Sequence, residues 1–508
     1  MSGERRLDTA ELRRRAACAA TGLSELGVGP GDVVALYLRN DFALFEASFA
    51  AGMLGAYPTP VNWHYVPDEA DYLFRDSGAK VIVIHADLLE KVRGVIPPDA
   101  LILVAPTPQE IAQAYGLAPE RCAAPEGMRS WDEWVEGFSP YAGPIASPPG
   151  SIIYTSGTTG RPKGVRRAAS TPEQAAASAA SVSVFFGLSA ENAERIVSVM
   201  TGPMYHSAPN YYGLACAQLG AHLHLQPRFD PEDLLRMIQE HRVTHLHMVP
   251  IMFNRLLALP DQVKRKYDLS SLEFVVHAAA PCPAPIKRAM IEWWGPVIME
   301  YYGSTETGAV VFCDSEQWLA HPGTVGKAMF GADVRVVDAE GRTLPVGEIG
   351  EVLARWPTLA DFTYHGDDDK RLAAEKVGLI APGDIGYMDE DGFLYLCDRA
   401  KDMIISGGVN IYPAEIEAVL QRMPGVADCA VFGIPDDEYG EAVYAVVQAQ
   451  ADVELTEDGV KSYLSGQISG FKMPKHVAFQ ADLPREDSGK IFKRKLREPF
   501  WTQRDSLI

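Results

Sequence analysis

Cysteine is scarce in this sequence and follows no recognisable pattern. Seven cysteines are scattered among 508 residues, and no two of them form a CxxC pair. An odd number of cysteines without regular spacing argues against a disulfide framework and against a structural zinc site. The seven are Cys18, Cys122, Cys216, Cys282, Cys313, Cys397 and Cys429. We therefore expect a reducing, cytoplasmic location.

Long apolar runs are also missing. No stretch reaches the roughly 18 to 20 apolar residues that a membrane-spanning helix needs. The segment MSGERRLDTAELRRRA carries charge without an apolar core, so we expect no secretory signal. Integral membrane contact is not expected.

Basic residues are too few to balance the acidic ones. Lys and Arg number 46 against 67 Asp and Glu, which gives a formal net charge of −21. Such a surface repels nucleic acid, so nucleic acid is not an expected partner. Anionic small molecules would need local basic groups and backbone N–H donors.

What the sequence does contain is an alternation of helical and strand patterns. Asp8 and Thr9 are typical caps for a helix that continues through ELRRRAACAATGLSEL to Gly27. Apolar runs such as VVALYL and KVIVIHA predict buried strands. This pattern predicts an α/β fold with largely parallel sheets.

Further strands are expected in the middle of the chain, and the pattern changes after about residue 320. The middle strands are IVSVM, HLHLQ, HLHMVP, LEFVVHAAA and VIMEYYG. GADVRVVDAEGRTLPVGEIGEVLAR then predicts a β-rich subdomain. The last part predicts a small α+β domain. We expect a large domain over residues 1–400 and a small one over 401–508.

The strongest chemical signal is a glycine-rich segment after an apolar strand, Tyr154 to Gly164, with the sequence YTSGTTGRPKG. Glycines let the backbone approach a ligand, and consecutive N–H groups bind anions. Ser and Thr hydroxyls and Lys163 add further donors. The segment lacks the GxxxxGK[ST] spacing of a Walker A loop, but its chemistry suits a triphosphate.

This segment resembles the signature loop of the adenylate-forming superfamily, which includes acyl- and aryl-CoA synthetases, adenylation domains and luciferases. Four later segments match that family in the same order, over about residues 8 to 497. They are YYGSTE at 301–306, PGD at 382–384, DRAKD at 398–402 with SGGVNIYP after it, and PREDSGKI at 484–491. The resemblance is closest to fatty-acid and aryl-acid CoA ligases.

The resemblance implies a site for ATP, Mg²⁺ and CoA. Tyr302 would stack on adenine, Asp384 would bind the ribose, and Arg399 would contact ribose and phosphate. Lys401 would be the hinge between the domains. Glu306 and Thr158 would hold Mg²⁺. The other implied nucleotide and CoA contacts are Thr155, Ser156, Gly157, Thr159, Gly160, Lys163, Gly303, Thr305, Gly407 and Gly408.

By the same resemblance, Lys490 is the catalytic lysine of acyl-adenylate formation, and His206 lies at the acyl pocket near the substrate carboxylate. An ammonium between a carboxylate and the α-phosphate offsets their repulsion. Lys493, Arg494, Lys495 and Arg497 are expected to form a solvated basic tail, with contact to CoA phosphates as an alternative.

The expected reaction joins a small-molecule carboxylic acid to CoA through an acyl-adenylate. The pocket segments 204–210, 247–253 and 277–282 carry no charged partner for an amine or a second carboxylate, and no large side chain obviously closes the pocket. Fatty, aromatic and bulky cyclic acids all remain open. No carrier domain follows Lys490 within this sequence, so CoA is the expected acceptor.

Two other readings remain open. The protein could be a free-standing adenylation enzyme that loads a carrier protein, or a non-catalytic nucleotide- or acyl-binding protein. The sequence leaves the oligomeric state open, a homodimer included. Histidines at 222, 224, 241, 245 and 247 lack the carboxylate or cysteine spacing of a metal site, so we expect none there.

Overall fold

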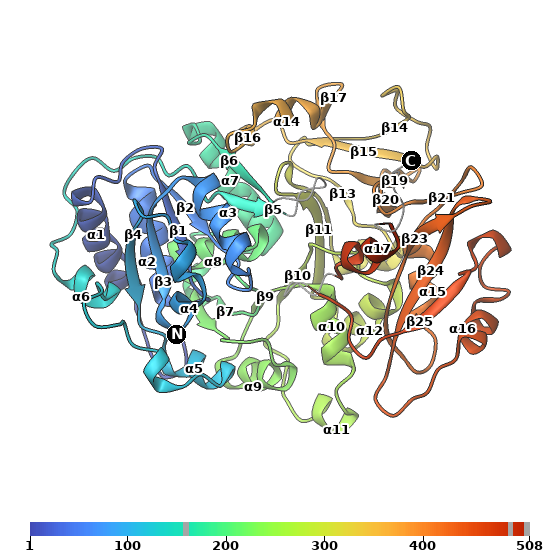
Figure 1. The fold of residues 1–508 in the computed structure, drawn as a ribbon, viewed down its shortest axis with the longest axis horizontal. Helices are drawn as coiled ribbons and strands as arrows, with labels where there is room; N and C mark the ends of the chain where they lie inside the picture. The colour runs from blue at the N-terminus through green and yellow to red at the C-terminus, as the bar shows by residue number, and fades with distance from the viewer. Residues whose placement is uncertain (156–161, 486–490, 502–508) are drawn as a thin grey trace.

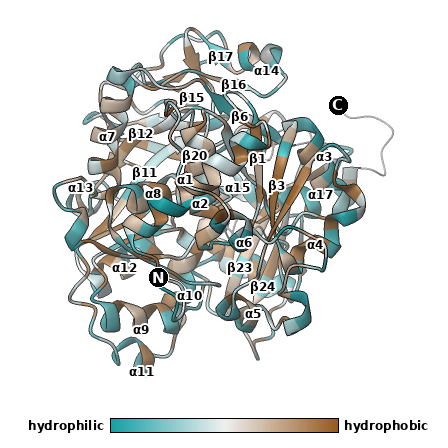
Figure 2. Ribbon diagram, turned by 90° about the vertical axis from the view of Figure 1, so that its left-hand side faces the viewer, coloured by the Kyte–Doolittle hydropathy of each residue, from teal (hydrophilic) through white to brown (hydrophobic). Residues whose placement is uncertain are grey.

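The first part of the computed structural model is a four-stranded parallel sheet with helices around it. The structure describes residues 1–155, 162–485 and 491–501. The strand order is β2 (Tyr57–Pro60), β1 (Val33–Tyr37), β3 (Ala79–His85) and β4 (Leu101–Ala105). All five residues of β1 are buried, as expected for a parallel strand covered on both faces. Figure 2 shows β1 and β3 in the brown of apolar residues.

Helices connect and cover these strands (Figure 1). They are α1 (Thr9–Glu25), α2 (Phe42–Met53), α3 (Pro67–Ser77), α4 (Ala86–Val92), α5 (Gln109–Tyr115) and α6 (Trp131–Glu136). The predicted first helix is confirmed, because the Asp8 side chain accepts a hydrogen bond from the Glu11 backbone N–H at 2.8 Å.

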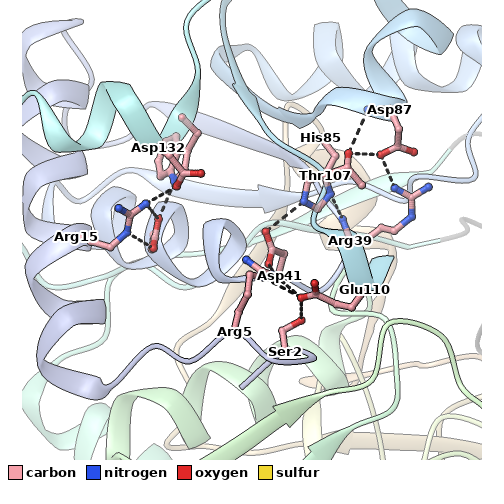
Figure 3. Close-up of polar contacts among 12 residues, drawn as sticks. Ser2, Arg5, Arg15, Arg39, Asp41, His85, Asp87, Thr107, Glu110 and Asp132 are labelled. Atoms are coloured by element: carbon pink, nitrogen blue, oxygen red, sulfur yellow. Dashed lines mark hydrogen bonds and ion pairs between the residues drawn. The ribbon is translucent and has the colours of Figure 1, made fainter. Parts of the chain in front are cut away.

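Buried ion pairs hold these elements together (Figure 3). Arg15 of α1 lies 2.6 Å from Glu46 of α2, and the same carboxylate accepts a hydrogen bond of 2.7 Å from the Trp131 indole N–H. Asp41, just before α2, is 3% exposed and lies beside Arg5 and His85. Charges inside this unit are therefore paired, as burial requires.

The second sheet has seven strands and is mostly parallel. Its order is β13 (Lys327–Ala328), β12 (Gly308–Cys313), β11 (Ile298–Ser304), β10 (Phe274–His277), β9 (His245–Met248), β7 (Val197–Met200) and β8 (His222–Leu225). The five strands expected in the middle of the chain are confirmed. β12 and β13 run antiparallel to their neighbours at one edge.

Helices cover both faces of the second sheet. One core joins it to α9 (Pro231–His241), α10 (Pro250–Leu257) and α12 (Ala284–Trp294). Another core contains residues of α7 (Pro172–Phe186), α8 (Ser207–Leu219), α1 and α2, so these helices lie between the two sheets. Short helices α11 (Asp261–Lys264) and α13 (Ser315–Ala320) follow α10 and β12.

Two smaller sheets continue the large unit. β16 (Phe362–Tyr364), β6 (Lys163–Arg167) and β5 (Ile153–Thr155) form one antiparallel sheet. The predicted β-rich subdomain is the other, with α14 (Asp368–Ala373) beside it. Its strands are β14 (Asp333–Val337), β15 (Gly350–Arg355), β17 (Glu375–Lys376), β18 (Leu379–Ile380), β19 (Asp384–Met388) and β20 (Leu394–Arg399).

The last part of the chain is a small α+β unit, drawn in orange and red in Figure 1. Its strands are β21 (Ile404–Ser406), β22 (Val409–Ile411), β23 (Val426–Asp436), β24 (Gly440–Ala449) and β25 (His476–Phe479). Its helices are α15 (Pro413–Leu420), α16 (Glu457–Leu464) and α17 (Lys493–Trp501). The predicted fold class is confirmed. No helix among the described residues is long and apolar enough to span a membrane.

Candidate active site

A cleft of about 2870 Å³ runs between the sheets and the small C-terminal unit. Ten of the residues predicted from the sequence line it. They are Thr155, Lys163, His206, Tyr302, Gly303, Thr305, Glu306, Asp384, Arg399 and Lys401. Residues separated by more than two hundred positions thus meet in one place.

The described ends of the glycine-rich segment lie on two paired strands at this cleft. Thr155 at the end of β5 pairs with Lys163 at the start of β6. The Lys163 ammonium lies 4.9 Å from the centre of the Tyr364 ring. The predicted contacts Ser156, Gly157, Thr158, Thr159 and Gly160 lie outside the described residues. The two ends of the segment are therefore fixed at the cleft.

Tyr302, Asp384 and Arg399 form a connected trio. The Tyr302 hydroxyl donates to Asp384 Oδ2 at 2.7 Å, and Arg399 Nε lies 2.8 Å from Asp384 Oδ1. Asp384 and Arg399 face each other on the paired strands β19 and β20. Burial and the neighbouring carboxylate raise the pKa of Tyr302, so its hydroxyl stays protonated and donates. The trio gives the cleft one wall with an aromatic face and charged groups.

The turn after Tyr302 depends on glycine. A Cβ atom added to Gly303 would lie 1.9 Å from the Gly308 carbonyl oxygen, so no larger residue fits. Farther along, Thr305 Oγ1 donates a hydrogen bond of 3.2 Å to Ser207 Oγ at the start of α8. The turn is thereby tied to the helix that His206 precedes.

Glu306 is held from two sides. Its Oε1 accepts a hydrogen bond of 3.0 Å from the Tyr364 hydroxyl, and its backbone carbonyl accepts one of 2.6 Å from Arg167. Its Oε2 accepts none from the described residues. A carboxylate oxygen in a cleft suits a hard cation such as Mg²⁺, so this residue fits the predicted metal. The second predicted ligand, Thr158, is not described.

Beyond His206 the cleft has an aromatic lining. His206 is the N-cap residue of α8, and its ring lies 4.5 Å from that of Tyr205. Tyr301 projects from β11 on the opposite face from Tyr302, since side chains alternate along a strand. Its hydroxyl shares a hydrogen bond of 2.9 Å with His247 Nε2.

Three more rings complete this aromatic pocket, which we define as Phe185, Phe186, Tyr212, His247 and Tyr301. The Phe186 ring lies 5.1 Å from Tyr212 and 6.0 Å from both His247 and Tyr301, and Phe185 lies 5.7 Å from Tyr301. Burial lowers the pKa of His247 to about 4, so the pocket is uncharged at neutral pH.

Four of the five rings come from α7, α8 and β11, outside the three segments expected to line the pocket. The adjacent phenylalanines at 185–186 and the first tyrosine of YYG were the available signals. Arg167 and Tyr364 were also missed, because their contacts with Glu306 exist only after β6 and β16 pair.

Fewer of the residues predicted from the sequence come to the cleft from the small C-terminal unit. Lys401 is exposed, and its backbone carbonyl accepts a hydrogen bond of 3.4 Å from Arg497. Gly407 and Gly408 form the tip of the β21–β22 hairpin and do not line the cleft. Lys490 lies outside the described residues.

The expectation of a solvated tail is wrong for Lys493. Its side chain is 18% exposed and its ammonium lies 2.8 Å from the Glu417 carboxylate of α15. The buried carboxylate needs a counter-charge, which explains why this lysine is not solvated.

The histidines form no metal cluster among the described residues. His224 and His241 stack with ring centres 4.0 Å apart, and His247 belongs to the aromatic pocket.

Comparisons with known proteins agree over nearly the whole chain. The family model described as AMP-binding enzyme matches residues 1–362, and the model described as AMP-binding enzyme C-terminal domain matches residues 415–490. The chain is similar to a feruloyl-CoA synthase from Amycolatopsis, with 34% identity over 97% of this chain and 94% of that protein.

It is also similar to the long-chain-fatty-acid–CoA ligase FadD13 of Mycobacterium tuberculosis, with 31% identity over 97% of this chain and 93% of that one. Among solved structures, ATP-bound MatB from Rhodopseudomonas palustris matches with a TM-score of 0.82 and 29% identity. The match covers 97% of this chain and 93% of MatB.

Proposed function

We propose that this chain, which belongs to the AMP-binding enzyme family and is an AMP-forming acid–CoA ligase, acts on a carboxylic acid that carries a ring. The observation that supports this substrate class is the aromatic pocket. Phe185, Phe186, His247 and Tyr301 line the same cleft as the nucleotide residues, and Tyr212 packs behind them. Flat rings pack well against aromatic side chains.

In the first step, one oxygen of the substrate carboxylate forms a bond to the α-phosphorus of ATP. The bond between that phosphorus and the bridging oxygen to the β-phosphorus breaks, and pyrophosphate leaves. We assign Tyr302 to the adenine, Asp384 and Arg399 to the ribose, and Lys163 to the phosphates. Lys490 stabilises the charge that develops as the two anions meet.

In the second step, the sulfur of CoA forms a bond to the acyl carbon, the acyl–phosphate bond breaks, and AMP leaves while the thiol proton is released. We assign the hairpin of Gly407 and Gly408 to this step, after rotation about Lys401. The domain boundary at residues 400 and 401 belongs to the same proposal.

Mg²⁺ would supply positive charge against the phosphates when bound. Glu306 is the described residue that would hold it, with Thr158 as the second proposed ligand. His206, next to Tyr205 and before α8, would hold the substrate carboxylate.

The test is pyrophosphate release with ATP and Mg²⁺ against matched acids, with and without CoA. We expect cinnamate- and benzoate-type acids to exceed straight-chain acids of equal carbon number, with sustained turnover only when CoA is present. Release that stalls as bound adenylate whatever the CoA concentration would favour a carrier-protein acceptor. Release only with straight-chain acids would contradict the substrate proposal.

A further inference from the structure

Arg167 makes an unusual set of contacts. It stands at the end of β6, the strand that begins at Lys163 after the glycine-rich segment. Its guanidinium donates to the backbone carbonyls of Thr305 at 2.8 Å and Glu306 at 2.6 Å, and also to that of Ala360. It forms no ion pair with a carboxylate of the described residues.

The three acceptors around the partly buried guanidinium are all backbone carbonyls. This arrangement indicates that Arg167 holds the backbone of these segments in place. An arginine guanidinium stays charged in proteins at neutral pH. The guanidinium has five N–H donors in a rigid plane, so it can serve several carbonyls at once, whereas a lysine ammonium cannot reproduce this arrangement.

Tyr364 holds the other side of the same residue. Its hydroxyl donates to Glu306 Oε1 at 3.0 Å, and its ring faces the Lys163 ammonium. In this bond the tyrosine hydroxyl is the donor and the carboxylate oxygen is the acceptor. One carboxylate oxygen is thereby fixed, while Oε2 stays available to a ligand.

We propose that Arg167 and Tyr364 are positioning residues that hold the Glu306 carboxylate in place for metal-bound ATP. Arg167 fixes the backbone of the turn, and Tyr364 fixes the carboxylate. Because β6 begins at the glycine-rich segment and pairs with β16, one small sheet sets the distance between the phosphate contacts and Glu306. This inference rests on the proposed function.

Two variants separate the two contacts, and each has a matched control. Tyr364→Phe removes one hydroxyl and keeps the ring over Lys163. Its control is Tyr395→Phe, which removes a similar bond of 3.1 Å to the Asp389 carboxylate, away from Glu306. Arg167→Met removes the guanidinium, and Arg166→Met is its control. Arg166 is the neighbour on β6 and lies 4.3 Å from the Tyr57 ring.

The measurement is calorimetric binding of α,β-methylene-ATP, which cannot be cleaved at the reacting bond, with Mg²⁺ and with EDTA. We expect Mg²⁺ to tighten binding to the wild type and to both controls. In Arg167→Met and Tyr364→Phe, this gain in affinity should fall by about tenfold, which is the size expected for one charge-assisted hydrogen bond. The affinity of both variants in EDTA should stay within about twofold of the wild-type value. Arg167→Lys should restore only part of the gain.

Three results would overturn the inference. They are an unchanged Mg²⁺ gain in Tyr364→Phe, an equal loss of binding with and without Mg²⁺, and a wild type that binds the nucleotide without any Mg²⁺ gain. A wild type that binds no nucleotide and releases no pyrophosphate would instead refute the proposed function. If Arg167→Met does not fold, as judged by its thermal melt, Tyr364→Phe alone decides.

Discussion

Tyr301 lies beside three of the four other rings of the aromatic pocket. It lies between Phe185, Phe186 and His247, and its hydroxyl is satisfied by His247. Replacing it with alanine should open space for a larger acid. We expect Tyr301→Ala to raise the ratio of kcat/KM for 2-naphthoate over benzoate by roughly tenfold or more, since a few carbon atoms in such a pocket change binding by 1–3 kcal/mol.

The control for this size effect is Tyr301→Phe, which keeps the ring and removes only the hydroxyl. Its ratio for the two acids should stay close to that of the wild type. An unchanged ratio in Tyr301→Ala would mean that this ring does not border the bound acid.

At the scale of elements, Asp41 links the start of α2 to β3 and to the N-terminal segment, through His85 and Arg5. Burial by itself would raise the pKa of Asp41, but the hydrogen bond and charge of His85 and the charge of Arg5 outweigh it and lower the pKa to about 2. The pKa is depressed on folding. The ionised carboxylate therefore stabilises the fold above its unfolded pKa of 3.8, and this stability is lost as the pH falls through about 2.

We accordingly expect Asp41→Asn to cost about 2 kcal/mol at pH 7. In thermal melts, the melting temperature of the variant should lie roughly 2 to 4 °C below that of the wild type. The gap should not narrow between pH 7 and pH 5, and it should shrink only in strong acid, when the wild-type carboxylate takes up a proton. A gap that already closes between pH 7 and pH 5 would assign the stability to another group.

Elements were predictable where the local sequence decides the structure. The helix from Asp8 follows from its cap, and β1 and β3 follow from apolar runs. β2 was not predicted, because its two prolines argue against a strand. It forms at the edge of the sheet, where the missing backbone N–H groups interrupt no hydrogen bonds between strands.

The site was predictable only in part, for a similar reason. Residues such as Tyr302, Asp384 and Glu306 stand within recognisable segments. The contacts of Arg167 with Glu306 and of Tyr301 with His247 arise from strand pairing and helix packing between segments far apart in the chain. No local pattern carries that information.

For the whole molecule, the position of the Gly407–Gly408 hairpin tip yields the last prediction. The tip lies outside the cleft, whereas α17 of the same unit reaches it. If the small unit rotates between the two steps, the tip meets the substrate only during thiol transfer. Gly408→Ala should then slow thioester formation by about tenfold or more, as expected for misplaced reacting groups. The rate of adenylate formation, measured as pyrophosphate release in a single turnover, should stay within about twofold of the wild-type rate.

Backbone strain alone does not explain such a result, because the chain contains a matched control. Gly408 and Gly466 both have φ of +80°, and an added Cβ would meet no atom within 4 Å at either position. Alanine therefore costs similar backbone strain at both sites. Gly466 lies after α16, so Gly466→Ala should leave both steps unchanged. Equal slowing in the two variants, or a Gly408→Ala enzyme impaired in adenylation, would show that the hairpin tip has no specific part in the second step.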